Sequence, residues 1–252
     1  PEFTTYAAQL DAVLATWKQQ WRPRLLEVGP GTVPRTFIVE LGEALLRAYK
    51  GQPLVDPYAM YQHLMDYWAT TLKDDVYMLV EDGWNAVAEP VRDKNGKVKR
   101  DAYTCDLVPL PLLVARHFAT EQAHVAQLQA AHEALAQQVE ELLEEHSGDE
   151  GALAPAMNEK GKVSKATLTA LHKELKDDRE SADEAKLVKH LLKLMDEEAK
   201  AKKAAKEAEE ELEAAAWKRY ATLTQAEVQQ LVVDAKWLAD LQSSLTTELD
   251  GI

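Results

Sequence analysis

The chain has 252 residues, 46% of them apolar, which suffices for one large domain or two small ones with a packed core. Asp and Glu outnumber Lys and Arg by 43 to 29. The resulting net charge of −14 disfavours binding of bulk DNA or RNA by this chain alone. We expect neither a membrane span nor a signal peptide, because no long apolar run occurs. The single Cys105 cannot form an internal disulfide, which predicts a cytoplasmic location.

The N-terminal part of the chain predicts three helices. Residues 5–22 place apolar side chains at a spacing of three and four, and Pro23 is expected to end or restart this helix. A second helix is predicted over residues 35–49. Asp56 is suited to cap a third helix whose first turn holds Pro57. Because the chain begins with Pro1 and not with Met, we expect it to be a piece of a longer protein.

A small antiparallel sheet is predicted next, within residues 75–105. Residues 75–80 are rich in β-branched and aromatic side chains, and residues 87–91 and 98–105 flank an Asn-Gly dipeptide that is typical of hairpin turns. We interpret the basic residues around this turn as a solvated hairpin tip, with a phosphate contact as the less favoured alternative. They are Arg92, Lys94, Lys97, Lys99 and Arg100.

Two long stretches with a heptad rhythm are the most informative feature of the chain. Residues 112–146 and 181–220 each carry apolar side chains at an average spacing of 3.5. A polar connection joins them, with a short helix that Ser164 is suited to cap. Because such a seam must be buried against another helix, we predict an antiparallel coiled-coil arm over residues 112–222.

The predicted fold class is therefore mainly α, with a small antiparallel β insert in a first region (1–111) and a long coiled-coil arm. A capping box at Thr224 and Glu227 opens a last helical segment, 223–252, which we expect to be truncated. We predict that apolar residues of the arm and of this segment face a partner protein. These predicted interface residues are Val125, Leu128, Leu135, Val139, Leu142, Leu187, Leu191, Leu194, Leu212, Val228, Leu231, Trp237 and Leu238.

Three patterns suggest a chemical function, but for each of them a purely structural interpretation is favoured. Residues 27–32 resemble a glycine loop for S-adenosylmethionine, but a helix is predicted before them where that loop needs a strand. His117, Glu121 and His124 are expected on one helical face, yet no second Glu-x-x-His completes a metal site. Carboxylates at the ends of a predicted strand, such as Asp75, are more typical of caps and turns than of catalysis. Cys105 is more typical of a small packed residue than of a reactive thiol.

Several strings of the sequence resemble one protein family. They are YAMYQHLMDYW (58–68), DDVYMLV (74–80), DGW (82–84), DLVP (106–109), VARHFA (114–119), NEKGKV (158–163) and LVVDAKWL (231–238). The chain resembles, from about residue 35 onward, the C-terminal half of the modification subunit of type I restriction-modification systems.

This resemblance implies a DNA N6-adenine methyltransferase that uses S-adenosylmethionine. The cofactor loop and the Asn-Pro-Pro-Phe or Asn-Pro-Pro-Tyr motif of the family lie upstream of the matched region. No catalytic, cofactor-binding or metal-binding residue is therefore expected in this chain. The implied partners are the specificity subunit, a second modification subunit and the restriction subunit, with DNA bound only within the complex. We expect an assembly and docking module; the alternatives are an autonomous S-adenosylmethionine-dependent enzyme and a self-associating coiled-coil scaffold.

Overall fold

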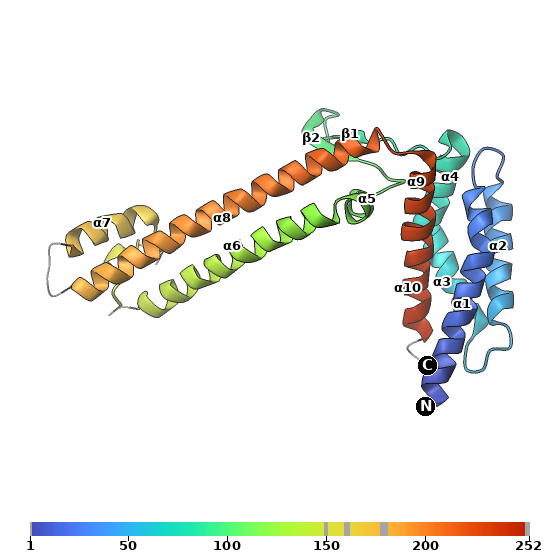
Figure 1. Cartoon of the computed structure of the whole chain (residues 1–252), viewed down its shortest axis with the longest axis horizontal. Coiled ribbons are helices and arrows are strands. Elements are labelled where there is room, and N and C mark those ends of the chain that lie inside the picture. The colour runs from blue at the N-terminus through green and yellow to red at the C-terminus, as the bar shows by residue number, and fades with distance from the viewer. Residues whose placement is uncertain (1, 149–150, 159–161, 177–180, 250–252) are drawn as a thin grey trace. The chain divides into compact units, whose positions relative to one another are not determined.

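The computed structural model of the chain describes residues 2–148, 151–158, 162–176 and 181–249 (Figure 1). Residues 159–161 of the NEKGKV string and the chain end at 250–252 lie outside the described residues, as do the side chains at 99–102, which include two of the predicted tip residues. Helices hold 77% of the chain and the sheet has two antiparallel strands, so the predicted mainly α fold with a small β insert is confirmed.

The chain divides into two compact units. Unit 1 comprises residues 1–117 and 214–252, and unit 2 comprises residues 118–213. The C-terminal segment, which the sequence suggested as a region of its own, thus belongs to the same unit as the N-terminal helices. Helix α8 (Ala182–Tyr220) contributes to both units.

Unit 1 is built mainly from helices. Helix α1 packs on α2 and α10, and α3 packs on α2 and α10, so the C-terminal helix completes a bundle begun by the N-terminal ones. Its core-facing side chains follow the helical period, as in α2, where Phe37, Leu41 and Leu45 are buried. The elements are α1 (Glu2–Leu26), α2 (Pro34–Tyr49), α3 (Pro57–Tyr67), the π-helix η1 (Trp68–Leu72), α4 (Lys73–Asp82), α5 (Leu110–His117), α9 (Gln225–Gln229), the π-helix η3 (Gln230–Trp237) and α10 (Leu238–Leu249).

The prediction that Pro23 ends or restarts the first helix is wrong, because α1 continues through it without a break to Leu26. Proline removes one backbone hydrogen bond from a helix. Here it lies close to the C-terminal end, where few later turns depend on that bond. The buried side chain of Leu25 holds this last turn in the core.

The prediction of a strand over residues 75–80 is also wrong. These residues lie in α4, which continues directly from α3 through η1. Leu72, Val76 and Leu79 are buried at a helical spacing, whereas Tyr77 is 56% exposed. The helical period of the buried side chains therefore outweighs the β propensity of the individual residues. Gly83 ends α4 with a φ of 70°, a value that favours glycine.

The sheet of unit 1 is a hairpin of β1 (Glu89–Arg92) and β2 (Val98–Thr104). Pro90 pairs with Tyr103 and Arg92 with Val98, and the register shifts between the two pairs. The predicted Asn-Gly turn is confirmed, since Gly96 adopts a φ of 78°.

Unit 2 is an antiparallel helix pair with a small third layer at one end (Figure 1). It contains α6 (Ala119–His146), the 3-10 helix η2 (Ala154–Ala156), α7 (Lys165–Leu175) and most of α8. The single helix predicted from 112 to 146 is wrong, because Phe118 has non-helical backbone angles and separates α5 from α6. The predicted cap at Ser164 is confirmed: its hydroxyl accepts a hydrogen bond from the Thr167 amide.

The capping box that opens α9 gives a first testable prediction. Thr224 Oγ1 accepts a hydrogen bond from the Glu227 amide, and Glu227 Oε2 accepts one from the Thr224 amide. We expect Thr224→Ala to lower the free energy of unfolding of the full chain by about 1 kcal/mol, because the first turn loses its cap. Chemical denaturation measures this change. The control Thr247→Ala changes an exposed threonine in the last turn of α10, and an equal loss in both variants would contradict the assignment.

Candidate docking surfaces and a buried ionic network

The predicted interface residues of unit 2 lie along α6 and α8, which run antiparallel (Figure 1). None of them is exposed. Val125, Val139, Leu191 and Leu194 are buried, and Leu128, Leu135, Leu142, Leu187 and Leu212 are half-buried. The chain itself therefore covers this seam, and whether a partner also contacts these residues stays a prediction.

The end of the helix pair carries a small hydrophobic core that the sequence pattern did not predict. Leu153, Ala156 and Leu168 are each at most 2% exposed, and they pack in one cluster with Val139 of α6 and Leu191 of α8. Helix α7 and η2 thus close the end of the pair. The side chains that cover this end come from the polar connection between the two long helices and not from the heptads.

A polar pair interrupts the apolar seam of unit 2 halfway along the helices. His132 of α6 and Glu198 of α8 lie 3.0 Å apart between Nε2 and Oε1, and each side chain is about one-quarter exposed. A single polar contact inside an apolar seam specifies which turns of two helices meet. This pair therefore fixes the register of α6 against α8.

The predicted interface residues of the C-terminal segment lie in the core of unit 1. Val228, Leu231, Trp237 and Leu238 are each at most 4% exposed. They belong to α9, η3 and α10, which pack against α1, α3 and α5. A partner would contact these four residues only after part of unit 1 opened.

A buried ionic network joins three segments of unit 1 that are far apart in sequence. Lys236 Nζ donates to Asp75 Oδ1 at 2.8 Å and to the carbonyl oxygens of Asp106 and Leu107 at 2.9 and 3.2 Å. The indole N–H of Trp237 donates to Asp75 Oδ2 at 2.7 Å. Asp75 is 3% exposed and Lys236 is 7% exposed, so every partner in this network is needed to offset the loss of hydration.

Burial changes the acid–base behaviour of the groups in and beside this network. Burial raises the pKa of the Asp75 carboxyl, and the hydrogen bonds from Lys236 and Trp237 oppose that change. Burial also raises the pKa of the Cys105 thiol. A thiol with a raised pKa is a poor nucleophile at neutral pH, which supports a packing role for Cys105.

The residues considered for metal binding do not form one site. The helix break at Phe118 places His117 at the end of α5 and leaves Glu121 and His124 in α6, so the three no longer share one helix. Burial and the nearby Arg219 lower the pKa of His117. Within the described ranges, no three His, Cys, Asp or Glu side chains are grouped so that they could hold a metal ion.

The glycine-containing loop at 27–32 joins two helices, α1 and α2. It closes on itself, since the Thr32 amide donates to the Gly29 carbonyl at 3.0 Å and the Gly29 amide donates to Thr32 Oγ1 at 3.1 Å. A nucleotide-binding glycine loop follows a buried strand and directs its amides at the ligand. Neither feature is present in this segment.

A serine, a histidine and a carboxylate lie in contact between α3 and α10, and no sequence motif predicted this arrangement. Ser244 Oγ lies 2.8 Å from His63 Nδ1, and His63 Nε2 lies 3.1 Å from Glu248 Oε2. Ser244 is inside α10, so its own amide is used by the helix and is not free to stabilise an oxyanion. The geometry therefore supports attachment of α10 to α3 and offers no support for acyl transfer.

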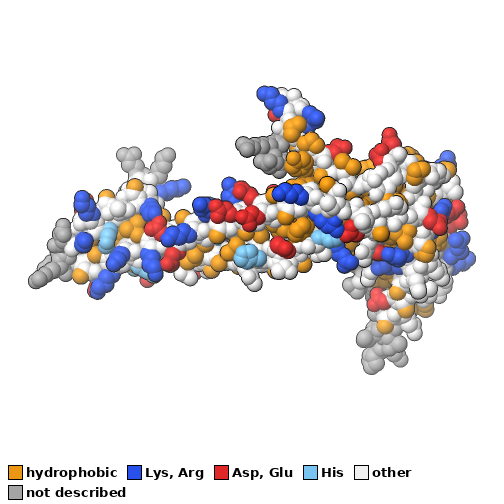
Figure 2. All heavy atoms as spheres, turned by 45° about the horizontal axis from the view of Figure 1, so that its top comes forward, with side chains coloured by type: hydrophobic (Ala, Val, Ile, Leu, Met, Phe, Trp, Pro, Cys, Tyr) orange, Lys and Arg blue, Asp and Glu red, His pale blue; other side chains and the backbone are white. Residues whose placement is uncertain are grey.

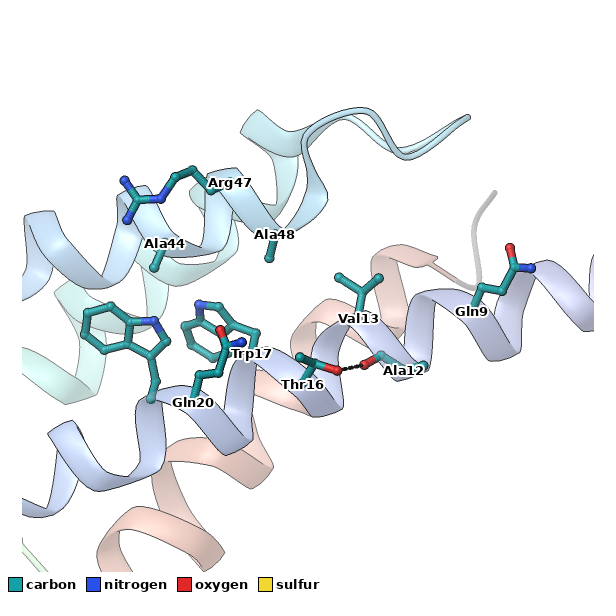
Figure 3. A pocket seen from close by; sticks show the side chains of 10 residues that line it. Gln9, Ala12, Val13, Thr16, Trp17, Gln20, Ala44, Arg47 and Ala48 are labelled. Carbon is teal, nitrogen blue, oxygen red and sulfur yellow. Dashed lines mark hydrogen bonds between the residues drawn. The ribbon is translucent and has the colours of Figure 1, made fainter.

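A groove of about 650 Å³ lies between α1 and α2. Trp17 and Gln20 of α1 and Ala44 and Arg47 of α2 line it, with the indole directed toward α2 (Figure 3). The buried indole N–H of Trp17 has no hydrogen-bond partner in the described part of the chain. Because that nitrogen is buried, the groove offers a ligand only its aromatic lining and the cationic side chain of Arg47.

Comparison of the chain with protein-family models, with curated proteins and with solved structures found no match. In the parts of the chain that the structure describes, no helix combines the length and the apolar character needed to cross a membrane.

Proposed function

We propose that the chain is an assembly and docking module of a DNA adenine methyltransferase subunit, similar to the modification subunit of type I restriction-modification systems. In the assembled enzyme it packs its helices on the specificity subunit, beside a second modification subunit and the restriction subunit. S-adenosylmethionine and the target adenine are handled by residues of the parent protein that lie outside this chain. Recognition of a target sequence in DNA takes place only within the complex.

One observation carries this proposal: strings that resemble the family meet in a single network. Asp75 belongs to the DDVYMLV string, Asp106 and Leu107 belong to DLVP, and Lys236 and Trp237 belong to LVVDAKWL. These strings lie far apart in sequence, and the contacts between them involve their polar residues. The resemblance therefore covers a set of residues that depend on one another, which supports a shared architecture more strongly than separate matches do.

The surfaces available for docking are limited by what the chain already covers. The seam of unit 2 is closed by its own helices, whereas the large apolar side chains that the described residues leave exposed lie in unit 1. Leu54 and Tyr58 are the most exposed, at 69% and 73%. Leu54 also has a φ of 61°, which is uncommon for a residue other than glycine, and its side chain is largely exposed. We therefore propose that docking uses the outer faces of unit 2 together with this part of unit 1.

Co-purification with the specificity subunit tests the proposal. We expect the parent modification subunit to retain that partner through size-exclusion chromatography and to lose it when residues 118–213 are replaced by a short linker. A second variant, Leu54→Ser with Tyr58→Ser, leaves unit 2 intact and tests the exposed part of unit 1. Circular dichroism and thermal unfolding of each variant separate loss of docking from loss of folding.

The outcomes distinguish docking from the other functions considered. A folded subunit that lacks residues 118–213 and still retains its partner would show that unit 2 is not the docking element. Self-association of the chain, seen as a mass that rises with concentration in light scattering, would favour a scaffold. Calorimetric titration with S-adenosylmethionine addresses the enzyme alternative. Gly29→Ala is a suitable variant there, because an added Cβ meets its nearest neighbour at 3.9 Å.

A further inference from the structure

The hairpin of β1 and β2 has a charge opposite to that of the chain as a whole. From Arg92 to Arg100 the sequence contains five basic residues and one acidic residue, Asp93, in a chain whose net charge is −14. Figure 2 shows Lys and Arg side chains gathered at the end of the projection that the hairpin forms. The hairpin is therefore a local cationic surface on an acidic protein.

The described lysines at this tip are free to bind an external anion. Lys94 and Lys97 are exposed, and no carboxylate of the described residues pairs with either of them. Basic residues elsewhere are often neutralised within the chain, as in the pair of Lys203 and Glu207. At about 0.15 M salt the Debye length is about 8 Å, so carboxylates beyond that distance affect the tip little.

The one acidic residue of the tip is used to shape the turn. Asp93 Oδ1 accepts hydrogen bonds from the amides of Asn95 and Lys97 at 2.8 and 2.9 Å. The Gly96 amide donates to the Asp93 carbonyl at 2.9 Å, and Gly96 adopts the positive φ that such a three-residue hairpin loop requires. The carboxylate thus fixes the backbone that carries the two lysines.

The base of the hairpin is also held in place. Tyr103 of β2 contacts Trp217, with ring centroids 5.6 Å apart, and Trp217 stacks on Tyr220 at 5.1 Å. The hydroxyl of Tyr220 donates to the carbonyl oxygen of Val108 at 2.7 Å. All four residues belong to unit 1. The tip is therefore presented on an anchored support, which lowers the entropy that binding would cost.

We propose that this hairpin tip binds the phosphate backbone of duplex DNA through Lys94 and Lys97. The inference deepens the proposed function and rests on it for the choice of DNA as the anion. Two exposed lysines on one turn can each contact a phosphate, and they carry no donor pattern for a particular base. The contact therefore positions the protein on DNA without reading sequence.

Fluorescence anisotropy of a short labelled duplex, titrated with the full chain between about 50 and 200 mM salt, tests this proposal. We expect binding that weakens steeply with salt. Lys94→Ala with Lys97→Ala is expected to weaken binding at the lowest salt by about tenfold or more and to reduce the salt slope by about two, one for each lost phosphate contact. Lys94→Arg with Lys97→Arg keeps both charges and is expected to keep the slope.

A control matched in charge uses exposed lysines of α8, Lys189→Ala with Lys202→Ala, which are expected to leave affinity and slope unchanged. The proposal is overturned if the hairpin variant titrates like this control, or if the unmodified chain does not bind the duplex at the lowest salt. The assay contains no specificity subunit. A failure of DNA binding and a failure of docking are thus observed separately.

Discussion

Replacing Lys236 by Met is expected to lower the free energy of unfolding of the chain by about 3–5 kcal/mol. Methionine fills a similar volume, so the loss comes from the partners that remain. Asp75 keeps only the indole hydrogen bond of Trp237, and the carbonyl oxygens of Asp106 and Leu107 lose their donor. Chemical denaturation followed by tryptophan fluorescence measures the loss. Trp84 contacts Trp237 at 6.0 Å, which places two reporters beside the network.

The same variant is expected to depend on pH in a defined direction. Burial already raises the pKa of Asp75, and removing the neighbouring cation raises it further. Between the ordinary carboxyl pKa of about 4 and this raised value, the folded variant binds a proton that the unfolded chain has released, so stability falls as the pH rises. The deficit relative to the unmodified chain should therefore shrink from neutral pH toward about pH 4–5.

Two results would contradict this account of the network. One is a deficit that stays constant across that pH range, since it would mean that Asp75 is not the group left uncompensated. The other is an equal loss in the control Lys202→Met, which removes an exposed lysine from α8. Exposed substitutions of this kind change stability by about 0.5 kcal/mol or less.

Replacing Leu191 by Ala is expected to destabilise unit 2 by about 2–5 kcal/mol. Leu191 is fully buried in the cluster that η2, α6, α7 and α8 form at the end of the helix pair. Truncation leaves a cavity in a small core that has few other residues to fill it. Native-state hydrogen exchange resolves the effect by region: amides of α7 should lose protection while amides of α3 in unit 1 keep theirs.

A matched control lies one turn earlier on the same helix. Leu187 is half-buried and does not belong to the cluster, so Leu187→Ala is expected to cost clearly less than Leu191→Ala. Equal losses would mean that the cluster has no special role in unit 2. Loss of protection throughout unit 1 would show that the two units unfold together.

The sequence by itself determined the features that depend on neighbouring residues. Asp56 and Pro57 begin α3, and Thr224 and Glu227 form a capping box, because caps need only side chains within one turn. The Asn95-Gly96 turn follows from the backbone freedom of glycine. The heptads likewise predicted two long helices with an apolar seam, since the spacing of the apolar residues can be read within each helix alone.

Only the tertiary structure decided which of these features prevail and which residues meet. Residues 75–80 form a helix because packing buries Val76 and Leu79 on one face, an outcome that overrides their β propensity. The contact of Lys236 with Asp75 joins positions 161 residues apart, and local patterns carry no information about such a pair. The same holds for the cluster at the end of unit 2, where residues of a polar connection supply the apolar cover. Burial depends on what the whole chain brings together, and this is the physical reason why these sites were not predicted from the sequence.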